Sequence, residues 1–124
     1  MNVLCVEQDR AKLRQMRNDV RELVPDACII VCRDPCKAGA IAKAKGCDIL
    51  LTGTAFNGHG MDGIMLAEQI RLMNPLVNII FIADHADSYM ACDAWKIRAS
   101  AFLLRPYEKQ RLAKAFADSR FAPV

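Results

Sequence analysis

The chain has 124 residues, of which 53% are hydrophobic and 25% charged, and its formal net charge is +3. This balance excludes a disordered chain, and we expect residues 1–124 to form a single globular domain. The apolar stretches are too short to cross a bilayer, and the N-terminus lacks the pattern of a signal peptide. We therefore expect a cytoplasmic protein without membrane contact, and its mild positive charge permits a polyanionic partner.

Short apolar runs alternate with amphipathic segments along the chain. The runs predict buried strands over residues 3–6, 28–32, 48–52, 77–82 and 101–104. Asp9 is expected to cap the first helix, and Asp34-Pro35 to open the second, which ends at Gly46. A glycine-rich loop over 53–60 precedes a third helix from about residue 62 to residue 73. A fourth helix carries Tyr89 and Trp95, and a last one carries Leu112 and Phe116.

This alternation predicts a parallel sheet that is covered by helices on both faces. Right-handed crossovers then give a doubly wound α/β sandwich with a five-stranded parallel sheet. In such folds functional residues gather at the carboxyl ends of the strands. We therefore expect five positions that are distant in sequence to share one neighbourhood: Glu7, Gln8, Gly53, Ala83 and Arg105.

Three segments carry recognisable motifs. They are Gly60–Ala67 with its Met-Asp-Gly, Val77–Ile82, and Asp93–Pro106, which ends in Leu-Arg-Pro. Together they resemble the receiver domain of two-component response regulators, most of all the type found ahead of LytTR DNA-binding domains. The resemblance covers nearly the whole chain. It implies the flavodoxin-like (βα)5 fold and a role in bacterial phosphorelay signalling or transcription control.

The resemblance also implies a chemistry, the transfer of a phosphoryl group from a histidine kinase to an aspartate after the third strand. The family uses an acidic pair after the first strand to hold Mg²⁺, a hydroxyl after the fourth strand and a lysine after the fifth. Here the acidic pair falls on Glu7 and Gln8, which Asp9 follows. The hydroxyl position falls on Ala83 and the lysine position on Arg105.

The position of the phosphoryl acceptor has no aspartate in any alignment. Counting forward from Asp48 places the acceptor at Gly53, and counting back from the Met-Asp-Gly motif places it at Ala55, with Thr54 between them. We therefore expect a pseudo-receiver that has no cofactor and no enzymatic activity. Mg²⁺ binding should be weak or absent, with Glu7 as the one weak metal candidate, and a histidine kinase is not expected to be the phosphodonor.

Three charged residues in the expected pocket have alternative roles. Glu7 and Asp9 form either a remaining metal or anion site, or a solvated strand end and a helix cap, and we favour the second role. Arg105 either binds an anion or pairs with Glu7. We favour the pairing, because a buried guanidinium without a partner is costly.

Two further clusters contain side chains that bind metals, and for both we favour a structural role over a metal site. The cysteines are expected to be small buried side chains, and the loop histidines to be exposed. The clusters are Cys28, Cys32 and Cys36 on one side, and His59, Asp84 and His85 on the other.

Two alternative functions stay open. A phosphorylatable receiver would use Asp48 or Asp62 as its acceptor. A nucleic-acid-binding module would use arginines spaced along one face of the first helix, although nearby Asp19 and Glu22 favour a solvated face. These arginines are Arg10, Arg14, Arg17 and Arg21.

The resemblance also implies a switch and an interaction surface. The aromatic residue at the position of Phe102 moves with the pocket hydroxyl in receivers, and Ala83 supplies no hydroxyl here. We therefore expect one fixed conformation. The partner is a signalling protein or a second copy of the chain, which would bind the surface of the last two helices and the fifth strand, near Tyr89 and Trp95. Nucleic acid would otherwise be bound only by a DNA-binding domain outside this sequence.

Overall fold

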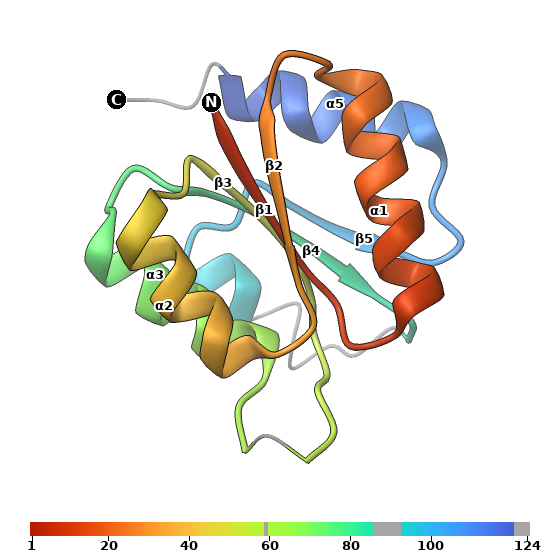
Figure 1. Ribbon diagram of the computed structural model, residues 1–124. Coiled ribbons are helices and arrows are strands. Elements are labelled where there is room, and N and C mark those ends of the chain that lie inside the picture. Colours follow the sequence, from red (N-terminus) through yellow and green to blue (C-terminus); the bar gives the residue numbers. More distant parts are fainter. Residues whose placement is uncertain (59, 86–92, 121–124) are drawn as a thin grey trace.

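The computed structural model describes residues 1–58, 60–85 and 93–120. Its centre is a five-stranded parallel sheet with the order β2-β1-β3-β4-β5 (Figure 1). The strands are β1 (Asn2–Val6), β2 (Cys28–Cys32), β3 (Ile49–Gly53), β4 (Asn78–Ala83) and β5 (Ala101–Leu104). The helices are α1 (Arg10–Leu23), α2 (Pro35–Lys45), α3 (Gly63–Met73) and α5 (Lys109–Arg120), and residues 93–96 are also helical. The predicted doubly wound parallel sheet is confirmed.

The helices begin and end where the sequence contains capping residues. The Asp9 carboxylate accepts a hydrogen bond from the Lys12 amide at the start of α1. Asp34 does the same for Cys36 at the start of α2, where Pro35 is the first helical residue. Gly46 ends α2 with a φ of 81°, a conformation that favours glycine. None of the helices in the described ranges has the length and apolar character needed to span a bilayer.

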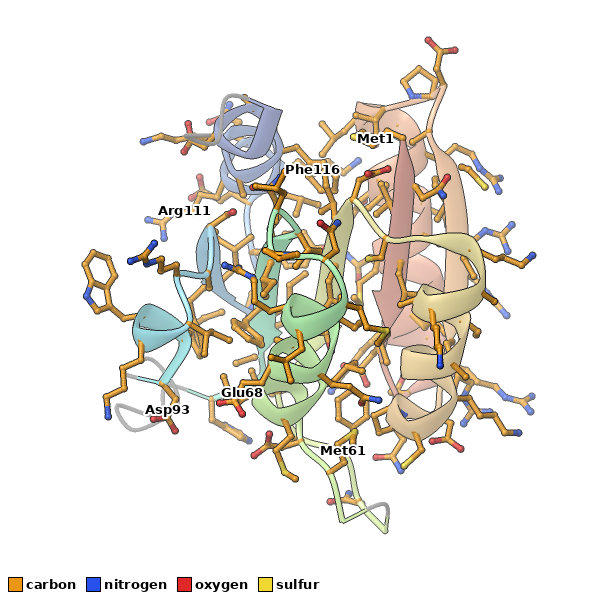
Figure 2. All side chains as sticks on the ribbon, turned by 90° about the vertical axis from the view of Figure 1, so that its left-hand side faces the viewer. Met1, Met61, Glu68, Asp93, Arg111 and Phe116 are labelled. Atoms are coloured by element: carbon orange, nitrogen blue, oxygen red, sulfur yellow. The ribbon has the colours of Figure 1, made fainter. Side chains whose placement is uncertain are left out.

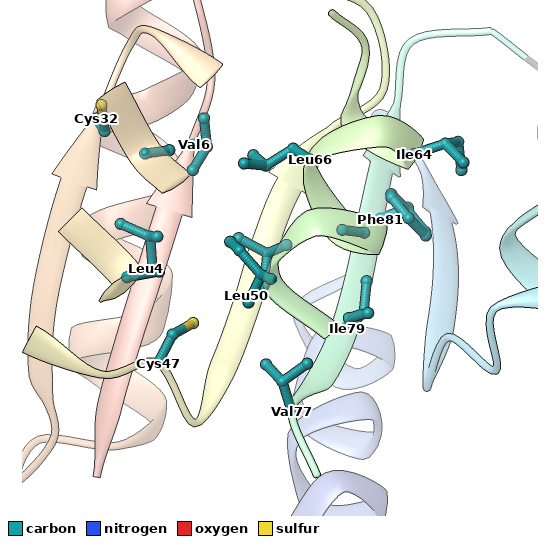
Figure 3. Close-up of a cluster of buried hydrophobic side chains, with 14 of the residues drawn as sticks. Leu4, Val6, Cys32, Cys47, Leu50, Ile64, Leu66, Val77, Ile79 and Phe81 are labelled. Carbon is teal, nitrogen blue, oxygen red and sulfur yellow. The ribbon is translucent and has the colours of Figure 1, made fainter. Parts of the chain in front are cut away.

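Helices cover both faces of the sheet. In Figure 1, α1 and α5 lie on one face and α2 and α3 on the other. Alternate residues of each strand point to opposite faces, so Leu4 and Val6 pack toward α2 and α3 while Val3 and Cys5 pack toward α1 and α5. Figure 3 shows the first of these two core clusters, in which Phe81 is completely buried. These two close-packed clusters keep the sheet rigid, so the loops at its carboxyl edge start from fixed positions.

Gly63 fixes the start of α3 against the end of β3. A Cβ atom at this position would lie only 2.0 Å from the Gly53 carbonyl oxygen, so no larger residue fits without a backbone shift. The Gly63 amide also donates a hydrogen bond to the Thr54 carbonyl at 2.9 Å. This close approach determines where the long loop between β3 and α3 leaves the sheet.

Some predicted boundaries and burial assignments differ from the structure. β3 and β4 each end one residue later than expected, at Gly53 and Ala83. The parallel pairing continues through Gly53–Ile82 between β3 and β4 and through Ala83–Leu104 between β4 and β5. Among the five described cysteines, Cys28 and Cys36 are exposed, whereas the other three are buried as expected. Burial raises the pKa of the Cys5 thiol to about 12, which makes this thiol unreactive.

Candidate functional site

The candidate site lies at the carboxyl edge of the sheet, where β1, β3, β4 and β5 end. In Figure 2, Met61 lies beyond this edge and Met1 lies at the opposite one. The backbone keeps the strand ends together just past the sheet. The Glu7 amide donates to the Cys32 carbonyl at 3.2 Å, and the Arg105 amide donates to the Ala83 carbonyl at 2.8 Å. The expected gathering of these distant segments is therefore present.

A buried ion pair occupies the centre of this edge. Glu7 is only 6% exposed, and its Oε1 lies 3.1 Å from Nη2 of Arg105. Its other oxygen, Oε2, accepts a hydrogen bond from the Asp9 amide at 2.9 Å. Both carboxylate oxygens therefore have partners, as a buried charge requires. The predicted pairing of Arg105 with Glu7 is confirmed, whereas a solvated position for Glu7 is wrong, because the pair draws its carboxylate into the protein.

The three residues considered for the acceptor position have different surroundings. A Cβ atom at Gly53 would lie 2.9 Å from Glu7 Oε1, so Gly53 faces the ion pair directly. Thr54 is buried, and its carbonyl is bonded to the start of α3. Ala55 is exposed on the loop. Only Gly53 therefore combines a position at the strand end with contact to the carboxylate of Glu7.

Arg105 has further partners around the ion pair. Its Nη1 donates to Oδ1 of Asp84 at 3.2 Å, and its Nη2 lies 3.4 Å from the sulfur of Met16. Asp84 also accepts a hydrogen bond from Nζ of Lys12 at 2.9 Å. This bond, with the nearby charges of Arg105 and Lys12, lowers the pKa of the Asp84 carboxyl below its usual range. The network of Glu7, Arg105, Asp84 and Lys12 joins the ends of β1, β4 and β5 to α1.

Gln8 has a structural role that the sequence did not indicate. Its amide nitrogen donates to the Asn57 carbonyl at 2.8 Å, and its amide oxygen accepts from the Asn57 amide at 2.9 Å. This pair of bonds fixes the loop after β3 to the end of β1. A carboxylate at position 8 has no hydrogen to donate, so it forms only one of the two bonds.

The helix-cap role favoured for Asp9 is confirmed. Its carboxylate accepts the Lys12 amide at 3.0 Å. This hydrogen bond is the main cause that lowers the pKa of Asp9. Asp9 therefore supports α1, and its own backbone amide supports Glu7.

The positions linked to a receiver switch are also occupied by apolar groups. Ala83 is buried at the end of β4 and carries only a methyl group. Phe102 is partly buried, and its ring centroid lies 6.1 Å from that of Phe81. Trp95, by contrast, is 83% exposed. Tyr89 lies outside the described residues.

The two alternative acceptors lie elsewhere. Asp48 precedes β3, so it lies at the opposite edge of the sheet, and its Oδ2 accepts the Asn2 amide at 2.7 Å. Asp62 caps α3 by accepting the Met65 amide at 2.8 Å. Both carboxylates therefore have structural partners.

The described residues contain no group of three or more metal-binding side chains. Of Cys28, Cys32 and Cys36, only Cys32 is buried, so the buried position predicted for Cys28 and Cys36 is wrong. His59 lies outside the described residues, so the proposed grouping with Asp84 and His85 is not covered by this finding.

Comparison with known proteins identifies the family to which this chain belongs. The family model described as the response regulator receiver domain matches residues 3–117. The chain therefore belongs to the response regulator receiver family, whose members are signalling modules of two-component systems. Receiver domains interact with other signalling proteins, often occur with DNA-binding domains, and bind Mg²⁺ weakly at the acceptor site.

Solved structures show the same fold at low sequence identity. A response regulator receiver domain protein from Clostridium thermocellum has a TM-score of 0.83 at 17% identity, over 95% of this chain and 92% of that one. A CheY-like receiver from Methanospirillum hungatei has a TM-score of 0.83 at 15% identity, over 94% and 90%. A DNA-binding response regulator of the LuxR family from Staphylococcus aureus has a TM-score of 0.83 at 13% identity, over 95% and 97%. No curated protein sequence matches the chain significantly.

Proposed function

We propose that this receiver domain is a pseudo-receiver, which transmits signals through protein contacts and is not phosphorylated on aspartate. One observation carries the proposal: Gly53, at the end of β3, faces the Glu7 carboxylate, and this carboxylate is paired with Arg105. An acyl phosphate forms only on a carboxylate. Gly53 has no side chain, and the nearby carboxylate of Glu7 is held by two donors.

The same residues do not fit a bound Mg²⁺ ion. Mg²⁺ needs oxygen ligands in near-octahedral geometry, with one or two carboxylates among them. Both oxygens of Glu7 already accept hydrogen bonds, and the Arg105 guanidinium brings a positive charge to the place where the cation would bind. The Gln8 amide oxygen is bonded to Asn57. The ion pair thus takes the place of a metal and a phosphoryl group.

The absence of the pocket hydroxyl supports a fixed conformation. The methyl group of Ala83 has no hydrogen bond to offer a ligand in the pocket. Phe102 packs against the buried ring of Phe81 and the core cluster around it. Ligand binding in the pocket therefore cannot shift a hydroxyl at position 83, so it does not move the Phe102 ring by that route.

The proposed interaction surface comprises the helical segment 93–96, β5 and α5. Trp95 is 83% exposed and Leu104 is 44% exposed, and large apolar side chains at such exposure favour a protein partner. The partner is a signalling protein or a second copy of this chain. Replacing Trp95 with alanine should weaken this association without changing the fold.

The proposal is tested by offering the full chain a small phosphodonor, such as acetyl phosphate, with Mg²⁺. We expect no acid-labile phosphate by mass spectrometry under conditions that label a receiver that carries the acceptor aspartate. Labelling mapped to a single residue would overturn the proposal. The variants Asp48→Asn and Asp62→Asn then show which alternative acceptor is used, because only one of them would abolish the label.

A further inference from the structure

A basic groove lies between α1 and the edge strand β2, away from the site described above. It has a volume of about 270 Å³. Arg10, Arg14 and Arg17 line it from α1, and Arg33, just after β2, lines it from the other side. The apolar residues Leu13 and Val31 complete the lining. β2 is an edge strand of the sheet (Figure 1).

The arginines of α1 form a nearly straight row. Positions 10, 14 and 17 follow one another at four and three residues, so they lie on one face of the helix, and Arg21 continues the row by one turn. At a rise of about 1.5 Å per residue, the row of four is about 16 Å long. All four side chains are exposed. The spacing therefore presents one positive charge per helical turn along the groove.

The acidic residues of α1 do not neutralise this row. Asp19 is buried and accepts a hydrogen bond from the Tyr107 hydroxyl, and Glu22 pairs with Lys109 at 2.9 Å, so both point toward the α5 side. None of the ion pairs among residues 1–58, 60–85 and 93–120 involves an arginine of the groove. The described lining of the groove contains no carboxylate. Asp19 and Glu22 were the reason to interpret this helix face as merely solvated. Because both side chains have partners on the α5 side, they no longer favour that interpretation.

Arg33 adds a preorganised donor to the groove. Its Nε donates to the Gln8 carbonyl at 2.9 Å, which fixes the guanidinium plane and leaves the two terminal nitrogens for another acceptor. A guanidinium held in this way loses little entropy when it binds a phosphate through two parallel hydrogen bonds. The groove thus has a fixed arginine on one wall and a row of arginines on the other.

We propose that this groove binds the phosphodiester backbone of nucleic acid without reading its sequence. A row of guanidinium groups matches a polymer that carries one phosphate per unit, and arginine suits the bidentate recognition of phosphate. No aromatic side chain is among the described residues of the lining, so base stacking does not contribute. An acidic protein segment is the weaker fit, because its carboxylates do not repeat with a fixed spacing along an extended chain.

The test measures binding of the full chain to a fluorescein-labelled 20-base-pair DNA duplex by fluorescence anisotropy as salt rises from 50 to 200 mM. If each of the four arginines that line the groove contacts one phosphate, the slope of log K against log[salt] is about −3.6. This slope corresponds to roughly a 150-fold loss of affinity over this range. Arg14→Glu with Arg17→Glu should reduce the slope to about −1.8 and weaken binding at 50 mM at least about tenfold.

A matched control separates the groove from net charge. Arg111→Glu with Lys114→Glu makes the same charge change on exposed positions of α5, and Figure 2 shows Arg111 on the side of the molecule away from β2. This control should bind DNA nearly as the parent chain does, whereas equal losses in both double variants would overturn the proposal. Absence of salt-dependent binding by the parent chain would also overturn it, as would equally tight binding of a polyglutamate of similar charge. Circular dichroism confirms that each variant is folded.

Discussion

A Cβ atom on Gly53 would lie 2.9 Å from Oε1 of Glu7, the oxygen that pairs with Arg105. The two positions are therefore coupled, since the space that an acceptor side chain requires is the space that the ion pair uses. Relaxing this contact requires Glu7 to move, but its carboxylate is bonded to Arg105 and to the Asp9 amide. The proposed pseudo-receiver thus depends on both features together, a glycine at the end of β3 and the buried ion pair beside it.

Gly53→Ala tests this coupling. The added methyl group forces the Glu7 carboxylate away from Arg105, so we expect the free energy of unfolding to fall by about 1–3 kcal/mol. In a Glu7→Ala background the same substitution meets open space and should cost much less. Chemical denaturation of the four proteins of this cycle gives the comparison. An equal cost in both backgrounds would show that Glu7 does not fill the space beside Gly53.

Arg105→Met tests the buried ion pair. The substitution keeps an apolar side chain of similar length but leaves the buried Glu7 carboxylate without its cation, so we expect a loss of about 3–5 kcal/mol in the free energy of unfolding at neutral pH. Lys109→Met, which breaks the exposed pair with Glu22, is the control and should have little effect. A similar small effect of both substitutions would contradict a structural role for the buried pair.

Gln8→Leu tests the attachment of the loop after β3. The leucine forms neither of the two bonds to Asn57, so we expect faster hydrogen exchange at the Asn57 amide, with little change in the exchange of the β1 amides. Gln8→Glu keeps only an acceptor and should give an intermediate rate. An unchanged rate in Gln8→Leu would mean that the loop is held by other contacts.

Asp84 gives a prediction about pH. Because its pKa is lowered in the folded state by Lys12 and Arg105, its charged form adds stability above the unfolded pKa, and this contribution is lost as pH falls below about 5. Asp84 is partly exposed, so solvent screening limits the contribution to less than about 1 kcal/mol. Asp84→Asn should therefore be less stable than the parent chain at pH 7 and nearly equal to it near pH 2. Asp26→Asn, an exposed carboxylate on another connection, is the control.

The architecture could be predicted from the sequence because local signals agree with one another. Capping residues such as Asp9 and Asp34 mark helix starts, and each strand contains a run of apolar residues. The strand ends were placed less accurately. β3 extends to Gly53 and β4 to Ala83 because their pairing with neighbouring strands continues to these residues. Pairing between strands that are distant in sequence cannot be inferred from the local sequence.

The site was predictable only in part. The Glu7–Arg105 pair followed from the cost of a buried charge, and the structure confirms it. Counting residues from Asp48 and from the Met-Asp-Gly motif gives two different acceptor positions, Gly53 and Ala55. The close approach of Gly63 to Gly53 fixes the start of the loop after β3, and this approach is not visible in the sequence. The bonds from Gln8 to Asn57 depend on the path of that loop. Sequence patterns do not give that path.

We propose that the ion pair of Glu7 and Arg105 replaces phosphoryl and Mg²⁺ binding in this receiver domain. The most direct test is a titration of the isotope-labelled chain with beryllofluoride, which mimics a phosphoryl group, and Mg²⁺, followed by two-dimensional NMR. We expect the amide signals of Gly53, Ala83 and Arg105 to stay unchanged at all concentrations. Saturable shifts of these signals would show that the pocket still binds both ligands and that the ion pair has not replaced them.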